Sequence, residues 1–422
     1  MVSHAAAVAS GAGSAVMKGW IPPVPLALGA LFGALSWTLV IVYGVTPSFG
    51  IALAWIHAVA LGSFTTIALT VLIHVVPGFT DLSWRGNALA RWSGALLPFA
   101  AAGFVLSFVT GAGLGVAIFG FASAIVILVY ASVAIATLVQ PAPSATEGAI
   151  ARAFLLVIVF LAVAAVLGAL LAYAYQSGDA GLLQFAPEHA AVALVGWLTL
   201  LAMGVSARTF RPILGSEPRW RAMHIFSSTA MLLSAIAIPV ALGIGILALT
   251  RTAFVIGVAA AALYAIDGFD RVLRAQTPNR PAHAFIVASL VWLVFSASAA
   301  AFGAYDVAVA TALAGWLGQM INAHLHHIGI RVIATAFAGD DDATRPWQLL
   351  DARLSWATVV LAQAAVVLLV LGAASDRPWS FVASGSVGLL AAVAFSVNAG
   401  IAMGRAKHIR NVEGLRLWET PI

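Results

Sequence analysis

Histidine is the one ionisable residue type that the sequence places deep within its long apolar segments, where such groups are costly and usually functional. These histidines are His57, His74, His189, His224, His324, His326 and His327. No Asp or Glu falls in the middle third of any such segment. A neutral imidazole binds iron or copper through one nitrogen, and its other nitrogen needs only one hydrogen-bond partner. The pattern predicts metal ligands, and haem suits apolar helices because its ring buries against aliphatic and aromatic side chains.

The spacing of these histidines divides them into an outer and an inner group. His57 and His74 are 17 residues apart, which is roughly 25 Å along a helix axis, so they cannot bind one metal. His57 and His189 are expected in the outer halves of two segments that cross in the same direction, and they are predicted to share one outer site. The other five are expected in the inner halves, where they could form a second site.

Two histidines of the inner group are separated by a single residue. His324 and His326 would point about 200° apart on a helix, so this pair could address two different centres, while His324 and His327 would share a face. The alternative for each histidine is a hydrogen bond across helices that only serves packing. That alternative is strongest for His74, His224 and His327, which lie near the expected interfaces.

The histidines belong to a very apolar chain. Hydrophobic residues make up 62% of the 422 residues and charged residues only 8%, which is typical of a polytopic membrane protein surrounded by lipid. Cys is absent, so disulfides, thiolate metal sites and haem attached through cysteine are excluded. The net charge of +5 is spread over many short loops, and nucleic acid is therefore not expected as a partner.

The apolar runs predict the helices that must position the histidines, since a span needs roughly 20 apolar residues. We expect an all-α polytopic fold of about twelve transmembrane helices. They are predicted near residues 23–45, 48–76, 93–111, 114–139, 151–175, 188–210, 222–248, 252–272, 283–303, 307–336, 353–373 and 379–404. Residues 1–22 and 405–422 are expected to be cytoplasmic tails of a single transmembrane domain at 23–404, the first tail mostly disordered. His4, His283 and His408 then lie in tails or loops and are expected to be solvated.

Charge predicts the orientation. With an even number of spans both termini lie on one side, and that side carries every Lys and Arg except Arg251 and Arg377. The positive-inside rule makes it the cytoplasmic side. We therefore expect a multi-pass protein of a bacterial inner membrane with both termini in the cytoplasm.

Three of the predicted spans repeat one another. Residues 193–198 read Ala-Leu-Val-Gly-Trp-Leu, and residues 312–317 read Ala-Leu-Ala-Gly-Trp-Leu. The second and sixth spans each carry a histidine followed by small apolar residues, at His57 and His189. Because these spans are four apart, we expect three pseudo-repeated four-helix units around a pseudo-threefold axis.

These features together resemble a known family. Twelve spans with both termini inside, a period of four helices and histidines on spans two, six and ten look like the haem–copper oxidase subunit I superfamily. Within it they resemble short divergent members and the related NnrS-type haem and copper membrane proteins. The stretches 57–77, 189–208 and 315–328 are similar to the second, sixth and tenth helices of that family.

The resemblance implies cofactors and ligand roles. His57 matches the second-helix ligand of a low-spin haem, expected to be b-type, and His189 matches the sixth-helix position that binds copper. His324 and His326 look like the tenth-helix pair that ligates two haems, although they lie deeper than that pair normally does. In this arrangement His57 pairs with the tenth span and His189 holds a separate metal, which is the alternative to a shared outer site.

The sequence also departs from the family. No adjacent histidines follow His224 on the seventh span, no tyrosine lies in the sixth, and the carboxylates and lysines of proton channels are missing from the spans. Oxygen-reducing proton pumping is therefore not expected.

Three classes of function stay open. The first is a membrane-embedded haem protein acting in electron transfer or in nitric oxide and respiratory metabolism. It would be an oxidoreductase related to cytochrome c oxidase subunit I or nitric oxide reductase, with a periplasmic electron donor or quinol as partner. The second is a histidine-lined transporter of metal or haem. The third is an assembly subunit whose histidines only pack. Nothing in the sequence predicts the oligomeric state.

Overall fold

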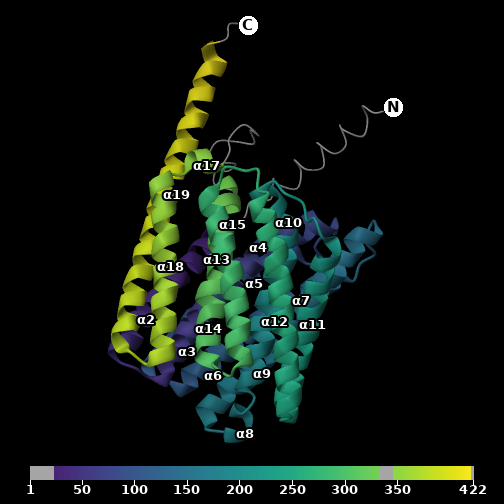
Figure 1. Cartoon of the computed structure of the whole chain (residues 1–422), viewed down its shortest axis with the longest axis vertical. Coiled ribbons are helices and arrows are strands. Elements are labelled where there is room, and N and C mark those ends of the chain that lie inside the picture. The colour runs from purple at the N-terminus through teal and green to yellow at the C-terminus, as the bar shows by residue number, and fades with distance from the viewer. Residues whose placement is uncertain (1–22, 333–345, 420–422) are drawn as a thin grey trace. The chain divides into compact units, whose positions relative to one another are not determined.

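The computed structural model describes residues 23–332 and 346–419, with side chains of the last helix as far as His408. Within these ranges the protein is helical apart from short turns, and it contains no strand (Figure 1). The predicted tail at 1–22 lies outside the described residues. The predicted tail at 405–422 continues the last helix as far as Glu419.

The helical segments follow the order of the predicted spans, with π-helical stretches labelled η. They are α2 (Pro23–Val45), α3 (Phe49–His57), η1 (Ala58–Thr65), α4 (Thr66–Thr80), α5 (Asn87–Thr110), α6 (Gly113–Leu138), α7 (Ala145–Ser177), α8 (Ala180–Leu183), α9 (Ala186–Ala191), η2 (Val192–Thr199), α10 (Leu200–Leu214), α11 (Arg221–Ile244), α12 (Leu247–Leu273), α13 (Arg280–Ala301), α14 (Tyr305–Ala310), η3 (Thr311–Leu317), α15 (Gly318–His324), η4 (Leu325–Gly329), α17 (Pro346–Leu349), α18 (Ala352–Ser375) and α19 (Pro378–Glu419). Successive α and η segments without a gap form one continuous helix.

Eleven helices in the described part are long and apolar enough to cross a membrane, so length and composition indicate a multi-pass membrane protein. The predicted span at 307–336 is not among them. Its described part is helical from 305 to 332, but Gln319, Asn322 and three histidines make it more polar than the others. Residues 333–336 lie outside the described residues. The count of twelve, and the orientation that depends on an even number, therefore stay predictions.

Specific residues set the ends of the helices. The Ser48 Oγ accepts from the Ile51 N–H at 3.2 Å at the start of α3, and Asp351 accepts from two backbone N–H groups at the start of α18. Gly111 and Gly178 end α5 and α7 with φ of 68° and 74°, which glycine adopts without a Cβ clash. These caps satisfy backbone groups that helix ends leave unpaired.

The chain forms two compact units. The first comprises Met1–Ser36, Ser48–Gly204 and Ala235–Gly245, and the second comprises Trp37–Pro47, Val205–Ser234 and Ile246–Ile422. Helices α2, α10 and α11 each contribute residues to both units.

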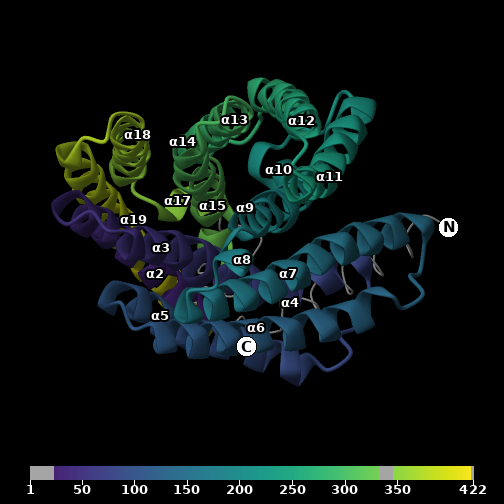
Figure 2. The same ribbon diagram turned by 90° about the horizontal axis from the view of Figure 1, so that it is seen from below.

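In the first unit, α5, α6 and α7 pack in chain order, and α6 contacts both of its neighbours (Figure 2). Helix α4 packs against α5 and α7, while α3 and η1 pack against α5. Segments α9 and η2 pack against α7. This packing places the helix that carries His57 against α5 and the helix that carries His189 against α7.

In the second unit, α12 packs against α13, and α18 packs against α19 (Figures 1 and 2). Helix α13 also contacts α14, η3, α15 and η4, which together form the helical stretch that carries His324 and His326. Helix α18 contacts α13, α14 and η3. The histidine-bearing stretch is thus supported by α13 and α18.

Three π-helical segments occur at matching places in the three helices that repeat in sequence. Segments η1, η2 and η3 contain Gly62, Gly196 and Gly315 respectively. A π-helical turn uses i→i+5 hydrogen bonds and is found mostly as a local interruption of α-helices, often at functional sites. The three segments thus share a local feature, while the three pseudo-repeated four-helix units around an axis stay a prediction.

An aromatic ring from a helix that precedes it in the chain packs against each of these glycines. A Cβ at the glycine would lie far inside van der Waals contact with that ring. The pairs are Gly62 with Phe32 at 2.3 Å, Gly196 with Phe160 at 2.3 Å and Gly315 with Trp292 at 2.6 Å. Glycine is therefore required for close packing at the same place in all three segments.

Replacement of Gly196 by alanine is expected to destabilise the protein by about 1–3 kcal/mol, the usual cost of overpacking. The expected readout is a lower midpoint of thermal unfolding in detergent, and the double variant G196A/F160A should recover part of the loss. Gly204→Ala is the matched control, because a Cβ there meets no atom within 4 Å. Equal midpoints for G196A and G204A would contradict the packing argument.

Side chains also bond to carbonyl groups within the π segments. Thr65 Oγ1 and Gln319 Nε2 each donate to the carbonyl five residues earlier, at 2.7 Å and 3.2 Å. Gln319 Oε1 accepts from Gln363 Nε2 at 2.7 Å, and Gln363 Oε1 accepts from Trp292 Nε1 at 3.0 Å. This chain of hydrogen bonds joins α15, α18 and α13 within the second unit and fixes the stretch that bears the inner histidines.

Candidate functional site

His57 is the last residue of α3 and directly precedes η1. Its Nδ1 lies 2.8 Å from the carbonyl oxygen of Leu53, one turn earlier. The rings of Phe104 and Phe108 on α5 lie 5.0 Å and 5.4 Å from the imidazole, the first edge-on and the second stacked. Because a carbonyl oxygen only accepts, Nδ1 must carry the proton, and Nε2 presents its lone pair.

His189 lies in α9, and its Nδ1 is 3.1 Å from the carbonyl oxygen of Ala164 on α7. Gly168, one turn further along α7, leaves room for the ring, since a Cβ there would lie 3.1 Å from the imidazole Cε1. The same argument places the proton of His189 on Nδ1 and the lone pair on Nε2. Helix α7 therefore fixes both the position and the tautomer of His189.

These two histidines lie near each other in the first unit. The imidazole of His57 is close enough to His189 to act on it electrostatically. Phe108, which stacks on His57, also contacts Tyr175 of α7, with 5.3 Å between the ring centroids. Both imidazoles therefore belong to one part of the first unit, and binding of one metal by the pair stays a prediction.

His324 and His326 belong to the second unit and are also held through Nδ1. Each Nδ1 lies 2.8 Å from a carbonyl oxygen four residues earlier, that of Met320 and that of Asn322. The two histidines differ at Nε2. The His324 Nε2 accepts from the Thr209 hydroxyl at 2.7 Å, whereas the His326 Nε2 is buried and has no hydrogen-bond partner.

The surroundings of His326 are apolar. Its side chain is fully buried, and the rings of Phe285 on α13 and Phe395 on α19 each lie 5.0 Å from it. A buried nitrogen without a partner costs about 1–3 kcal/mol. Such an atom needs an explanation, and ligation of a metal would supply one.

One arrangement is thus common to the four histidines that the sequence predicts as cofactor ligands. Each donates Nδ1–H to a backbone carbonyl. Metal-ligating histidines are usually held in this way, because the bond fixes the tautomer and raises the basicity of the other nitrogen.

The other three predicted metal ligands are held differently. The His327 Nδ1 faces the Asn279 amide nitrogen at 3.4 Å, so it accepts, and its proton lies on Nε2. The His224 Nδ1 lies 3.7 Å from a carboxylate oxygen of Asp267. His74 lines a pocket together with Arg91.

Among the described residues, the candidate metal ligands are single histidines or pairs of histidines. Within residues 23–332 and 346–408, no group of three or more His, Cys, Asp or Glu is placed to hold a metal ion. Haem iron needs only one or two axial imidazoles, because the porphyrin supplies its other ligands. The donor set fits haem.

No protein-family model matches the chain, and no curated protein matches it either. The resemblance to haem–copper oxidase subunit I therefore rests on the histidine-bearing stretches, and the function has to be argued from their geometry.

The structure contradicts the expectation that His283 is solvated. The span was expected to begin near residue 283, but helix α13 begins at Arg280, so His283 lies within its first turn. His283 is consequently only 4% exposed, and its Nε2 lies 2.8 Å from the Thr277 Oγ1. His408 is exposed, as expected, and His4 lies outside the described residues.

A buried charged pair in the second unit was not predicted. Asp267 and Arg271 are each 2% exposed and lie one turn apart on α12. The Arg271 guanidinium lies 5.1 Å from the centre of the Phe210 ring, and Asp267 faces His224. Opposite charges at i and i+4 near the end of a span are the sequence signal that identifies this pair.

Proposed function

We propose that the protein is a membrane-embedded haem protein whose first unit binds one haem iron between His57 and His189. The observation that carries the proposal is the Nδ1–H bond to a backbone carbonyl at both imidazoles, which lie near each other in one unit. This bond leaves each Nε2 lone pair for the iron. His57 and His189 would then hold the haem from two helices, and the haem would supply low-spin iron for electron transfer.

The neighbouring side chains have defined tasks in this proposal. Phe104 and Phe108 pack on the His57 imidazole, keep water away from it and provide an apolar wall. Gly168 leaves space for the His189 ring beside α7. Haem, when bound, supplies one-electron transfer, while these residues set ring orientation and solvent access, two properties that tune a bound metal.

The proposed role is electron transfer in respiratory or nitric oxide metabolism at a bacterial inner membrane. The charge distribution favours cytoplasmic termini, and both histidines then lie toward the outer face, where a periplasmic donor or a quinol can reach them. Oxygen-reducing proton pumping is not part of the proposal, because the adjacent histidines of the seventh helix and the channel carboxylates of true oxidases are missing from the sequence.

A histidine-lined transporter of metal or haem is the second candidate. Its support is the interruption of membrane-length helices by π segments and by prolines such as Pro98 and Pro239. Interrupted helices often surround a transport site. A transporter would bind its cargo reversibly, whereas the haem proposal requires a haem that stays bound through purification.

An optical spectrum tests the proposal. The protein, purified in detergent from cells supplied with haem precursors, should show a Soret band and, after reduction, sharp α and β bands. The expected content is at least one haem per chain, measured as the pyridine complex. A colourless protein with no bound iron would refute the haem proposal and leave transport or packing as the function of the histidines.

A further inference from the structure

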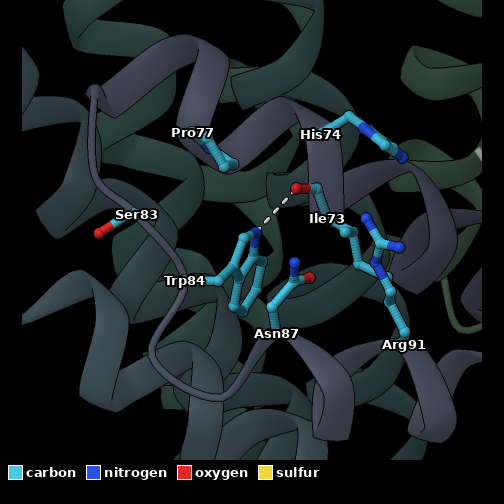
Figure 3. A pocket seen from close by; sticks show the side chains of 7 residues that line it. All are labelled: Ile73, His74, Pro77, Ser83, Trp84, Asn87 and Arg91. Carbon is cyan, nitrogen blue, oxygen red and sulfur yellow. Dashed lines mark hydrogen bonds between the residues drawn. The ribbon is translucent and has the colours of Figure 1, made fainter. Parts of the chain in front are cut away.

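A pocket of about 330 Å³ opens at one end of the first unit, which is within the size range of small ligand sites. It lies between the end of α4, the turn that follows α4 and the start of α5 (Figure 3). Its lining residues are Ile73, His74, Pro77, Ser83, Trp84, Asn87 and Arg91.

The wall of this pocket is built by a proline inside α4. Pro77 has no N–H to bond the Ile73 carbonyl four residues earlier. The Trp84 Nε1 donates to that carbonyl at 2.8 Å instead, which holds the indole across the pocket (Figure 3). The Gln140 side chain donates to the Ser83 carbonyl at 3.1 Å and fixes the turn from outside. The pocket is therefore part of the fold and does not depend on a loose loop.

The polar groups of the pocket lack an acidic partner. The Arg91 side chain extends toward His74 (Figure 3), close enough to act on it electrostatically. Arg91 forms no ion pair with any described residue, and no Asp or Glu lines the pocket. The His74 Nε2 is buried without a hydrogen-bond partner. A guanidinium without an acidic partner disfavours a metal cation and favours an anion, to which an imidazole N–H can donate a hydrogen bond.

The start of α5 adds to this preference. Its N-cap is Gly86, which has no side chain to bond the first-turn N–H groups. Asn87 and Arg91, from the first two turns of α5, line the pocket. The positive end of the helix dipole attracts phosphate and carboxylate groups. The guanidinium, the imidazole and the helix end therefore converge on one kind of ligand.

We propose that this pocket binds the phosphate of an anionic membrane lipid. It lies where two membrane-length helices end and begin, Phe49–Thr80 and Asn87–Thr110, which is the depth of the lipid headgroups. Arg91 and His74 would bind the phosphate, and Ile73, Pro77 and Trp84 would contact the apolar part of the headgroup region. His74 is then an anion ligand and not part of a metal site.

Lipid binding to the intact protein in detergent tests this proposal. Titration with dioleoyl phosphatidylglycerol, followed by native mass spectrometry, should show a saturable first site that dioleoyl phosphatidylcholine fills at least tenfold more weakly. Arg91→Gln should weaken the first phosphatidylglycerol site about tenfold, as expected for loss of one charge-assisted hydrogen bond. Arg91→Lys should retain most of the binding. Arg85→Gln is the matched control, because it removes the same charge from an exposed residue of the turn between α4 and α5 that does not line the pocket.

The possible results separate the sources of phosphate. Weakening by R91Q but not by R85Q supports the lipid site. Equal weakening by both variants would mean general surface attraction and would overturn it. A third result would also overturn the lipid proposal. Inorganic phosphate would raise the midpoint of thermal unfolding more in the wild-type protein than in R91Q, while phosphatidylglycerol would show no saturable first site. The ligand would then be a soluble phosphate.

Discussion

Replacement of either His57 or His189 by alanine is expected to remove the same reduced α and β bands from the spectrum of the purified protein. A haem held by both imidazoles loses its low-spin state when one is removed, because a single axial ligand leaves the iron five-coordinate or open to a weak ligand. The loss of the low-spin bands should be complete in each variant. Absorption spectra of the oxidised and reduced forms, with haem content determined in parallel, provide the measurement.

Two controls distinguish ligation from packing in this experiment. Free imidazole added to His57→Ala or His189→Ala should restore the low-spin bands, because it can occupy the space left by the side chain, whereas it cannot repair a misfolded bundle. His408→Ala should leave the spectrum unchanged, since this histidine is exposed. Loss of the bands in His57→Ala alone would favour separate centres for the two histidines. Wild-type spectra in both variants would remove the outer site altogether.

Replacement of His326 by leucine is expected to lower the bound haem or metal by one equivalent per chain, if the buried Nε2 is a ligand. His324→Ala is the internal control, because the Thr209 hydroxyl already occupies the Nε2 of His324. Haem content and metal analysis of the two variants should therefore differ, although the residues are only two positions apart.

The packing alternative for His326 makes the opposite prediction in a second measurement. Leucine removes a buried nitrogen that has no partner and fills the space between Phe285 and Phe395, so it should stabilise a protein without a ligand there by about 1–3 kcal/mol. A higher midpoint of thermal unfolding with unchanged metal content would assign His326 to packing. A lower midpoint together with lost metal would support ligation.

The positions of the helices could be predicted from the sequence because apolar runs of sufficient length leave the backbone no other way to satisfy its hydrogen bonds in lipid. Eleven of the predicted spans correspond to membrane-length helices. The tenth span is less apolar because it contains Gln319 and Asn322. The structural role of Gln319 follows only from its hydrogen bonds to Ala314 and Gln363, which the sequence does not show.

The histidines could be identified as candidate ligands from residue type and depth, but the hydrogen-bond partners of each imidazole could not be predicted. Whether Nδ1 meets a carbonyl, as in His326, or an amide donor, as in His327, depends on which neighbour the fold supplies. His283 is expected to be solvated because it is predicted at the edge of a loop, and only the packed start of α13 shows that it is buried. The burial of Asp267 and Arg271 could not be predicted, because both lie close to an expected interface.

The π segments change how side-chain directions should be derived for this chain. A π turn accommodates one more residue than an α turn, so residues beyond it are displaced around the axis by roughly 100° relative to a uniform helix. A helical wheel drawn through His57 and His74 therefore loses phase at η1. The same applies to His324 and His326, because η4 begins at Leu325, between them. A helical wheel for the second, sixth or tenth helical stretch therefore has to skip one residue at its π segment. Without that correction, residues beyond the segment are assigned to the wrong face of the helix and to the wrong neighbouring helix.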